Sequence, residues 1–306
     1  MASDIVVHGR PGTGLGAARH AVDAALAVFT TVDATCSRFR PDSPLVHMNT
    51  RPDRWHVVPA PLYRALREAH RAYERTKGRF DPRILQDLED LGYDRSLPFE
   101  EGPVRTRGPG GLRSGRRPPG KWRPRFRGGP RPQVHPGGAP IDLGGIGKGL
   151  AVRWAAEELD GVLGSYLIDA GGDCLCRGPG TTGRAWRVGV EDPRGGDGPL
   201  AVLELADLAC ATSSVRLRRW TAGGRAVHHL IDPRTGRPGG HGLLSVTVVD
   251  PDPAEAEVLS KSLFLAGGAM VGTEARRRNV AASWVTVDGT MSESPRIAPY
   301  VLWRSA

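Results

Sequence analysis

The chain has 306 residues, with 42 Lys and Arg against 33 Asp and Glu, which gives a formal net charge of +9. A chain of this length can bury a sizeable core as one large domain or two small ones, and none of its segments approaches the ~18 consecutive apolar residues of a membrane span. The first residues lack the basic, apolar and small-residue order of a signal peptide, so we expect a cytoplasmic globular protein without a membrane anchor.

The excess positive charge is concentrated in one segment. Residues 105–131 contain ten Lys or Arg and no acid, whereas the rest of the chain holds 32 basic and 33 acidic residues. The segment is also rich in Gly and Pro, which predicts a long mobile loop that builds no core. RNA binding by this Arg- and Gly-rich stretch is the alternative. Its single Trp and single Phe offer little stacking surface, so we expect no nucleic-acid partner.

The N-terminal part predicts a strand, a glycine-containing loop and a helix. Residues 4–8 alternate like a short strand, and residues 17–32 repeat apolar side chains at helical spacing. The loop between them carries a Gly-x-Gly-x-x-Ala motif, a relaxed dinucleotide fingerprint, with Asp33 near the position of a ribose-binding acid. No clear second strand follows Asp33, as a βαβ unit requires, so this motif is only a competing interpretation.

A second amphipathic helix is predicted over residues 59–76. It ends at Lys77-Gly78, where Gly takes the position after the last helical turn. The next residues are Arg79-Phe80-Asp81-Pro82. Because a proline holds the preceding residue out of helical geometry, the Asp81 carboxylate is expected to project from a loop.

A glycine-rich stretch occupies residues 140–149 and leads into a helical pattern over residues 150–159. Its glycines allow backbone amides to approach an anion closely, and Lys148 adds a cation, so the stretch predicts a phosphate-binding loop. It is not a Walker A loop, because Asp142 stands at the outer glycine position and Gly149 follows the lysine. Close packing of the following helix is the other interpretation.

Strand patterns dominate the second half of the chain. They cover residues 165–169, 186–192, 200–205, 209–214, 243–249, 282–287 and 299–303, with one amphipathic helix at residues 254–266. Two histidines, His228 and His229, enter an apolar strand that stops at an Asp-Pro turn, as expected of a base held at a strand end. Cys174 and Cys176 lie in a strand-like run, which favours buried thiols over a metal site.

Taken in order, these motifs resemble the ApbE family of flavin transferases, which move FMN from FAD onto a protein hydroxyl. The matching segments follow the family's order over nearly the entire chain: residues 35–45 with Asn49, then 78–82, 141–149, 169–173, 186–190, 211–213, 229–238 and 245–248. The resemblance implies a single α+β domain over residues 1–306, with the ApbE-like two-lobed fold, mixed and antiparallel sheets, packed helices and FAD between the lobes.

The resemblance also implies particular site residues. His229 is the expected general base, and Lys148 is expected to neutralise charge on the phosphates; a base with a pKa near 7 suits removal of a hydroxyl proton. By position, the residues expected to contact FAD are Phe39, Arg79, Phe80, Asp81, Asp142, Lys148, Thr212, Ser213 and Ile231.

One part of the chain departs from the family. The family binds Mg²⁺ through a backbone carbonyl near the glycine loop and through acids and a Thr on a late helix; the equivalent positions here are Gly145, Glu257, Ser260 and Lys261. Lys261 places a cation where Mg²⁺ needs an oxygen. We hypothesise that its ammonium partly replaces the charge of the metal, which makes magnesium weakly bound or dispensable. A solvent-facing Lys261 on an amphipathic helix is the alternative.

The expected activity is transfer of FMN from FAD to a Thr or Ser hydroxyl of an acceptor flavoprotein through a phosphoester bond, with AMP as the other product. The acceptor is expected to be intracellular. Two alternatives remain at this stage. One is a FAD pyrophosphatase that gives FMN and AMP, and the other is a FAD-binding protein without catalysis.

Overall fold

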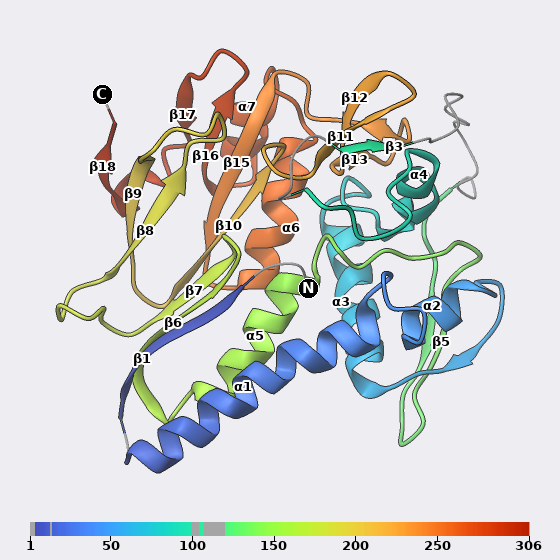
Figure 1. The fold of residues 1–306 in the computed structure, drawn as a ribbon, viewed down its shortest axis with the longest axis horizontal. Helices are drawn as coiled ribbons and strands as arrows, with labels where there is room; N and C mark the ends of the chain where they lie inside the picture. Colours follow the sequence, from blue (N-terminus) through green and yellow to red (C-terminus); the bar gives the residue numbers. More distant parts are fainter. Residues whose placement is uncertain (1–3, 13, 100–103, 107–119, 306) are drawn as a thin grey trace. The chain divides into compact units, whose positions relative to one another are not determined.

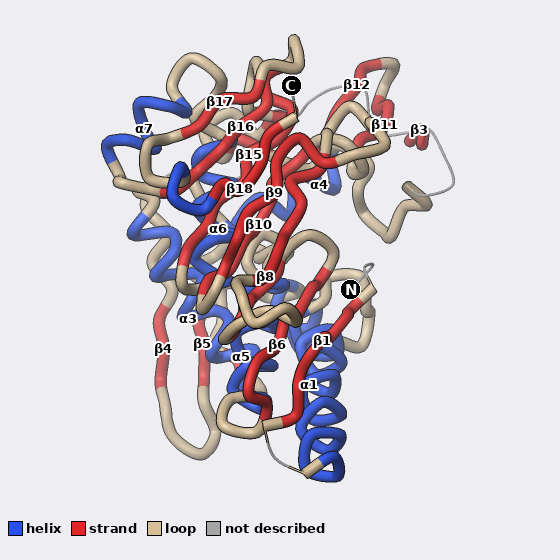
Figure 2. Tube along the Cα trace, turned by 90° about the vertical axis from the view of Figure 1, so that its left-hand side faces the viewer, coloured by secondary structure: helices blue, strands red, loops and turns tan. Residues whose placement is uncertain are grey.

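The computed structural model describes residues 4–12, 14–99, 104–106 and 120–305. The chain forms two compact units (Figures 1 and 2). Unit 1 contains Met1–Thr30, Lys148–Arg216 and His241–Ala306, and unit 2 contains Thr31–Gly147 and Leu217–Gly240. One boundary falls inside the predicted phosphate loop, between Gly147 and Lys148. The prediction of one domain over residues 1–306 stays a prediction.

A seven-stranded antiparallel sheet is the framework of unit 1 (Figure 1). Its strands, in spatial order, are β1 (Ile5–Pro11), β6 (Leu163–Ala170), β7 (Cys174–Arg177), β10 (Leu208–Ser214), β15 (Leu243–Asp250), β16 (Ala281–Thr286) and β17 (Met291–Glu293). Alternating or continuous apolar patterns predicted β1, β6, β10, β15 and β16, each to within a few residues at its ends.

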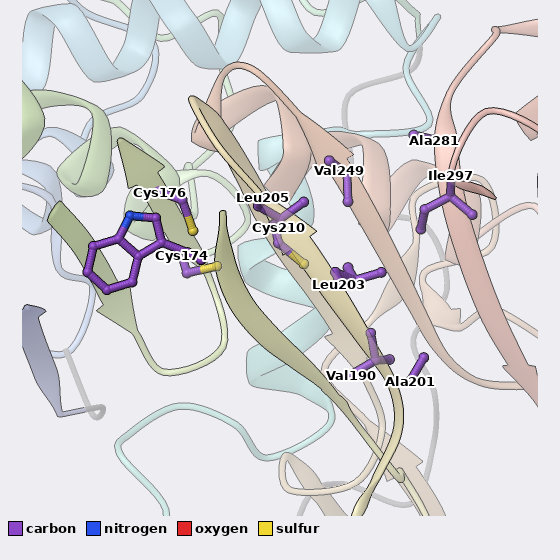
Figure 3. Packing of buried hydrophobic residues seen from close by; sticks show 11 residues of the cluster. Cys174, Cys176, Val190, Ala201, Leu203, Leu205, Cys210, Val249, Ala281 and Ile297 are labelled. Carbon is purple, nitrogen blue, oxygen red and sulfur yellow. The ribbon is translucent and has the colours of Figure 1, made fainter. Parts of the chain in front are cut away.

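A second, three-stranded sheet in unit 1 has the order β18 (Val301–Arg304), β9 (Pro199–Leu205) and β8 (Trp186–Glu191) (Figure 2). Its inward side chains share one core cluster with β7, β10, β15 and β16 (Figure 3). Cys174, Cys176 and Cys210 belong to this cluster as free, buried thiols. Burial of the Cys-x-Cys pair, predicted from its strand-like setting, is therefore confirmed.

Besides the first part of α1 (Leu15–Cys36), unit 1 contains the helices α5 (Gly147–Leu159), α6 (Pro253–Phe264) and α7 (Val271–Arg277) and the short 3-10 helix η2 (Ala298–Tyr300). Helix α5 begins one residue before the unit boundary. Helix α6 lies against β10 and β15 (Figure 1). Asp252 is its N-cap and Pro253 its first residue; the Asp252 Oδ1 accepts the amides of Ala254 and Glu255 at 2.9 and 3.1 Å. The start of α6 is therefore fixed locally.

Helices α5 and α6 approach each other closely where each begins. A Cβ atom on Gly149 would lie 2.5 Å from the Pro253 carbonyl oxygen and 2.6 Å from the Ala254 Cα, so only glycine fits there. Beside this contact, the Arg153 guanidinium binds the Asp252 carboxylate at 2.6 Å. The close-packing interpretation of the glycine-rich stretch is thus confirmed at Gly149.

Unit 2 combines short helices with three small sheets. Its helices are α2 (Pro44–Asn49), α3 (Ala60–Arg75), η1 (Pro82–Ile84) and α4 (Leu85–Asp90), and α1 (Leu15–Cys36) runs into it from unit 1. One sheet has the strand order β2 (His56–Val57), β5 (Gln133–His135) and β4 (Arg125–Arg127). A second has the order β12 (Arg225–His228), β11 (Arg219–Ala222) and β3 (Val104–Thr106), and the third pairs β13 (Ile231–Asp232) with β14 (Arg237–Pro238). Helix α3 ends as predicted, with Gly78 at φ +77° and its amide bound to the Tyr73 carbonyl at 2.8 Å.

The prediction of a loop without core contacts over residues 105–131 is wrong at both ends. Residues 104–106 form β3, and residues 125–127 form β4. Trp122 is only 2% exposed, and its indole N–H donates to the Pro136 carbonyl at 2.7 Å. Its large ring provides the buried surface that the Gly- and Pro-rich composition concealed. Residues 107–119 lie outside the described residues.

Three helices escaped prediction because they are too short to show a periodic pattern. Helices α2 and α4 have six residues each, and α7 has seven. In the part of the chain that the structure describes, none of the helices combines the length and the apolar character that crossing a bilayer requires.

Because of the contact at the start of α5, replacement of two glycines of this helix by alanine should have very different effects on the stability of the protein. Replacement of Gly149→Ala should lower the free energy of unfolding by about 1–3 kcal/mol or more, because the new methyl group meets backbone atoms that cannot move aside. Gly147→Ala is the matched control, since its Cβ would have no neighbour within 4 Å. Guanidinium unfolding measures both changes, and equal losses for the two variants would contradict the packing described here.

Candidate functional site

The predicted phosphate loop in unit 2 is held by the Asp142 side chain. Its Oδ1 accepts the Gly144 amide at 2.7 Å, and its Oδ2 pairs with the Arg38 Nε at 2.7 Å. The Asp142 amide donates to the Pro82 carbonyl, also at 2.7 Å. Because both carboxylate oxygens have partners within unit 2, the contacts of Asp142 fix the shape of the loop.

Arg38 is a site residue that the sequence reasoning missed. Besides pairing with Asp142, its guanidinium lies over the rings of Phe39, at 4.0 Å from the centroid, and Tyr93, at 4.4 Å. It also donates to the Tyr93 carbonyl at 2.6 Å. Arg38 is part of the matched segment 35–45, but nothing in that segment identifies its distant partners. Phe39 itself is 40% exposed, so an aromatic surface remains open beside this arginine.

The Arg79-Phe80-Asp81 segment is ordered by its own neighbours. Asp81 caps η1 and receives two side-chain bonds from Arg83, Nε to Oδ1 at 3.0 Å and Nη2 to Oδ2 at 2.8 Å. Phe80 is buried, with its amide bound to the Thr76 hydroxyl at 3.0 Å. The charge of Arg79 acts on the carboxylate of Asp232. The charge of this segment therefore contributes to the low pKa at the Asp-Pro-Arg turn.

His229 lies between β12 and β13 and has a defined proton arrangement. Its ring Nδ1 is 3.3 Å from the Arg218 carbonyl oxygen. A carbonyl only accepts, so Nδ1 carries a hydrogen in this bond, and in the neutral ring Nε2 is then the basic nitrogen. That is the form a general base requires. Ile231, two residues further on, is 2% exposed and packs in a cluster with Leu91 and Trp220.

The turn after His229 is closed by a fork between Asp232 and Arg234. Arg234 donates its backbone amide and Nε to Oδ1, at 2.9 and 3.0 Å, and its Nη2 to Oδ2 at 2.7 Å. Burial raises the pKa of Asp232, but the bonds and charge of Arg234, together with the charge of Arg79, more than offset this, so the pKa lies below its ordinary value. Asp81-Pro-Arg83 and Asp192-Pro-Arg194 form the same fork.

Unit 1 contributes Lys148, which is paired with an acid. The Lys148 ammonium lies 2.7 Å from Asp173 Oδ2, and the lysine side chain is 17% exposed while that of Asp173 is 3% exposed. Asp173 follows the turn at Gly171 and Gly172, both of which have positive φ. Among the described residues, Oδ2 has no hydrogen-bond partner besides this ion pair. The Asp-Ala-Gly-Gly-Asp block contained Asp173, but the sequence did not reveal its partner.

Thr212 and Ser213 do not point to the same side of the sheet. Adjacent residues of a strand face opposite ways. The Ser213 hydroxyl is 2.8 Å from the Ser260 hydroxyl on α6, whereas the Thr212 hydroxyl is 2.9 Å from that of Thr247, its partner on β15. Only Ser213 therefore faces the α6 side, and the two hydroxyls cannot contact one phosphate group from the same face.

The residues at the predicted metal position are occupied by other bonds. Glu257 is 1% exposed; its Oε2 accepts the Gly149 amide at 2.8 Å, and its Oε1 accepts from the Lys261 ammonium at 3.0 Å. The Ser260 hydroxyl donates to the Glu257 carbonyl at 2.9 Å. The solvent-facing alternative for Lys261 is wrong, because its side chain is only 17% exposed and is paired with Glu257.

These contacts do not fit a magnesium site. Mg²⁺ requires oxygen ligands in near-octahedral geometry, whereas Lys261 brings a cation and takes one of the carboxylate oxygens. Gly145 belongs to unit 2 and the other three positions to unit 1. Within residues 4–12, 14–99, 104–106 and 120–305, no group of three or more His, Cys, Asp or Glu side chains is arranged to hold a metal ion.

Comparison with known proteins identifies the family. The model of the ApbE family matches residues 3–284. The chain belongs to the ApbE family. Among curated proteins it is similar to the FAD:protein FMN transferases of Escherichia coli K12 and Haemophilus influenzae, each 32% identical over 49% of this chain and 43% of the relative. The aligned region therefore spans less than half the length of these relatives.

Solved structures confirm the predicted α+β, ApbE-like fold. The ApbE protein of Thermotoga maritima is 27% identical, with a TM-score of 0.77 over 97% of this chain and 96% of that one. The flavinyl transferase ApbE of Pseudomonas stutzeri, in its apo form, is 22% identical, with a TM-score of 0.76 over 98% and 94% of the two chains, and shows the same fold.

The fork at Asp232 predicts a pKa change that a single substitution reveals. In Arg234→Gln the pKa of Asp232 should rise, because burial is then opposed only by the backbone amide of residue 234 and the charge of Arg79. A carboxyl whose pKa is lower in the folded than in the unfolded protein stabilises the fold at pH values above its unfolded-state pKa. This stabilisation is lost as the pH falls through the folded-state pKa, so the Arg234→Gln variant, which has less of it, should lose less stability in acid.

Carboxyl NMR titration measures the pKa of Asp232, and acid unfolding measures the stability that is lost at low pH. Arg194→Gln is the matched control, since it breaks the equivalent fork at Asp192. An unchanged pKa of Asp232 in Arg234→Gln would contradict the proposed cause.

Proposed function

We propose that this protein transfers FMN from FAD to a Ser or Thr hydroxyl of an acceptor flavoprotein and releases AMP. The observation that carries the proposal is the ApbE family match over residues 3–284, since curated proteins similar to this chain are FAD:protein FMN transferases. Two features of the chain support it: a histidine whose Nδ1 is bonded to a backbone carbonyl, and a lysine held beside a buried acid. The proposal assigns roles within each unit separately.

His229 is the general base of the proposed reaction. The acceptor hydroxyl oxygen forms a bond to the phosphorus of the FMN phosphate, while the bond from this phosphorus to the bridging oxygen breaks. The hydroxyl proton goes to Nε2 of His229, and AMP leaves with the electron pair of the broken bond. The bond from Nδ1 to the Arg218 carbonyl holds the ring in the required tautomer and orients it throughout.

Lys148 neutralises negative charge on the diphosphate in this proposal. Asp173 holds the ammonium in place before substrate arrives, so its position requires no rearrangement. The amide of Gly149, which a phosphate-binding helix start would normally offer, is already bound to Glu257. Phosphate recognition at this point therefore depends more on the charge of Lys148 than on the first turn of α5.

The residues of unit 2 recognise the rest of FAD in this proposal. Phe39 offers an exposed ring next to the Arg38 guanidinium, which suits stacking with a flavin or adenine ring. Asp142 and Asp81 position the loops, since Arg38 and Arg83 already bind their carboxylates. For Arg79, Phe80 and Ile231, contact with FAD remains part of the proposal, as does phosphate or ribose contact for Ser213 and Thr212.

The test is flavin transfer by a pair of histidine variants. His229→Ala should lower transfer by about 10²–10⁴-fold, because a positioned base contributes that much to proton transfer, while FAD still binds. His228→Ala is the matched control: its ring Nδ1 accepts the Leu230 amide, so it serves the turn and not the reaction. In-gel flavin fluorescence of a co-expressed FMN-binding acceptor measures transfer, and FAD fluorescence measures binding.

Two outcomes would contradict the proposal. Labelling by His229→Ala at the rate of the unmodified enzyme would exclude this histidine as the base. Release of FMN and AMP from FAD alone, as fast as with an acceptor present, would instead favour the pyrophosphatase.

A further inference from the structure

Glu257 is a buried carboxylate that requires a counter-charge. At 1% exposure it has almost no access to water, and a buried, uncompensated carboxylate is costly to the fold. Its Oε2 accepts the amide of Gly149 and thereby caps the start of α5. The remaining oxygen, Oε1, is where a cation would be expected.

Lys261 supplies that cation from the same helix. It lies one turn after Glu257 on α6, with its ammonium 3.0 Å from Oε1, and the pair has no net charge. The adjacent hydroxyls form a directed chain. Ser260 donates its only proton to the Glu257 carbonyl, so Ser213 must donate to the Ser260 oxygen. This hydroxyl chain ends on the Glu257 backbone carbonyl, while each oxygen of the Glu257 carboxylate has its own donor, Gly149 or Lys261.

We infer that Lys261 supplies, from within the chain, the positive charge that a divalent cation would otherwise bring to Glu257, so that this enzyme works without bound magnesium. The part of the inference that concerns turnover rests on the proposed flavin transfer. The part that concerns metal binding rests on the contacts of Glu257 alone.

A divalent ion and the Lys261 ammonium exclude each other at Glu257. A metal bound to Oε1 would lie next to the ammonium, and a metal bound to Oε2 would compete with the Gly149 amide for that oxygen and weaken the cap of α5. An ammonium carries no lone pair for a metal, and its charge repels one at contact distance. Lys261 is therefore a positioning residue. It holds Glu257, which holds the helix turn that carries Lys148.

Manganese binding tests the inference without any enzymatic assay. Mn²⁺ alone is the probe, and loss of its free-ion EPR signal reports binding. The wild-type protein and Lys261→Arg should leave the signal unchanged, because both keep a cation at Oε1. Lys261→Thr replaces the cation with a hydroxyl and should bind Mn²⁺ at least about tenfold more tightly than the wild type, since a like charge in direct contact is gone. Circular dichroism confirms that each variant is folded.

Flavin transfer in the presence of EDTA tests the part of the inference that concerns turnover. The wild type and Lys261→Arg should label the acceptor equally well with EDTA or with Mg²⁺. In Lys261→Thr, EDTA should lower transfer by roughly 10²-fold, the usual cost of one lost charge-stabilising group, and Mg²⁺ should restore it. A purely structural role of Lys261 would lower transfer without making it dependent on Mg²⁺.

The results overturn the inference if wild-type protein removes the Mn²⁺ signal, if folded Lys261→Thr does not, or if EDTA abolishes transfer by the wild type. Failure of the proposed function is distinguishable from these. It would appear as an unlabelled acceptor in every variant and condition, while the Mn²⁺ titration still decides the role of Lys261.

Discussion

The bond between the Glu257 carboxylate and the Gly149 amide is the contact that fixes the start of α5. It joins the first turn of α5 to α6. Residue 149 must be glycine, because the start of α6 lies against it. Asp252 fixes that start and also binds Arg153 of α5. Lys148, one residue before the bonded amide, therefore emerges from a turn that is rigid before any ligand is present, as electrostatic preorganisation requires.

Paired charges are the common feature of the candidate site. Lys148 has Asp173, Asp142 has Arg38, and the Asp-Pro-Arg segments each close on themselves. Such pairs hold side chains in one rotamer and keep buried charge compensated. They also set a condition for substrate, because a phosphate group can use Lys148 only by sharing or replacing Asp173. Asp81, Asp142 and Glu257, which resembled ligands in the sequence, each hold a cation of the protein in place.

The sequence predicted the parts of the fold whose information is local. Periodic apolar residues located α1, α3, α5, α6 and most strands of the large sheet, and Gly78 marked the end of α3. Helices of six or seven residues carry too few turns for that signal. The partners of Asp142 and Lys148 could not be predicted, because each pair joins segments far apart in the chain. Lys261 departs from the family pattern in the sequence itself, but only the structure shows that Glu257 is its partner.

The protein's own donors, the Gly149 amide and the Lys261 ammonium, satisfy the Glu257 carboxylate and thereby fix the start of α5. Hydrogen exchange at the Gly149 amide is the sharpest test of this arrangement. We expect slow exchange in EDTA that stays unchanged when Mg²⁺ is added, because the amide is already bound to the Glu257 carboxylate. Fast exchange in EDTA that becomes slow only with Mg²⁺ would contradict it.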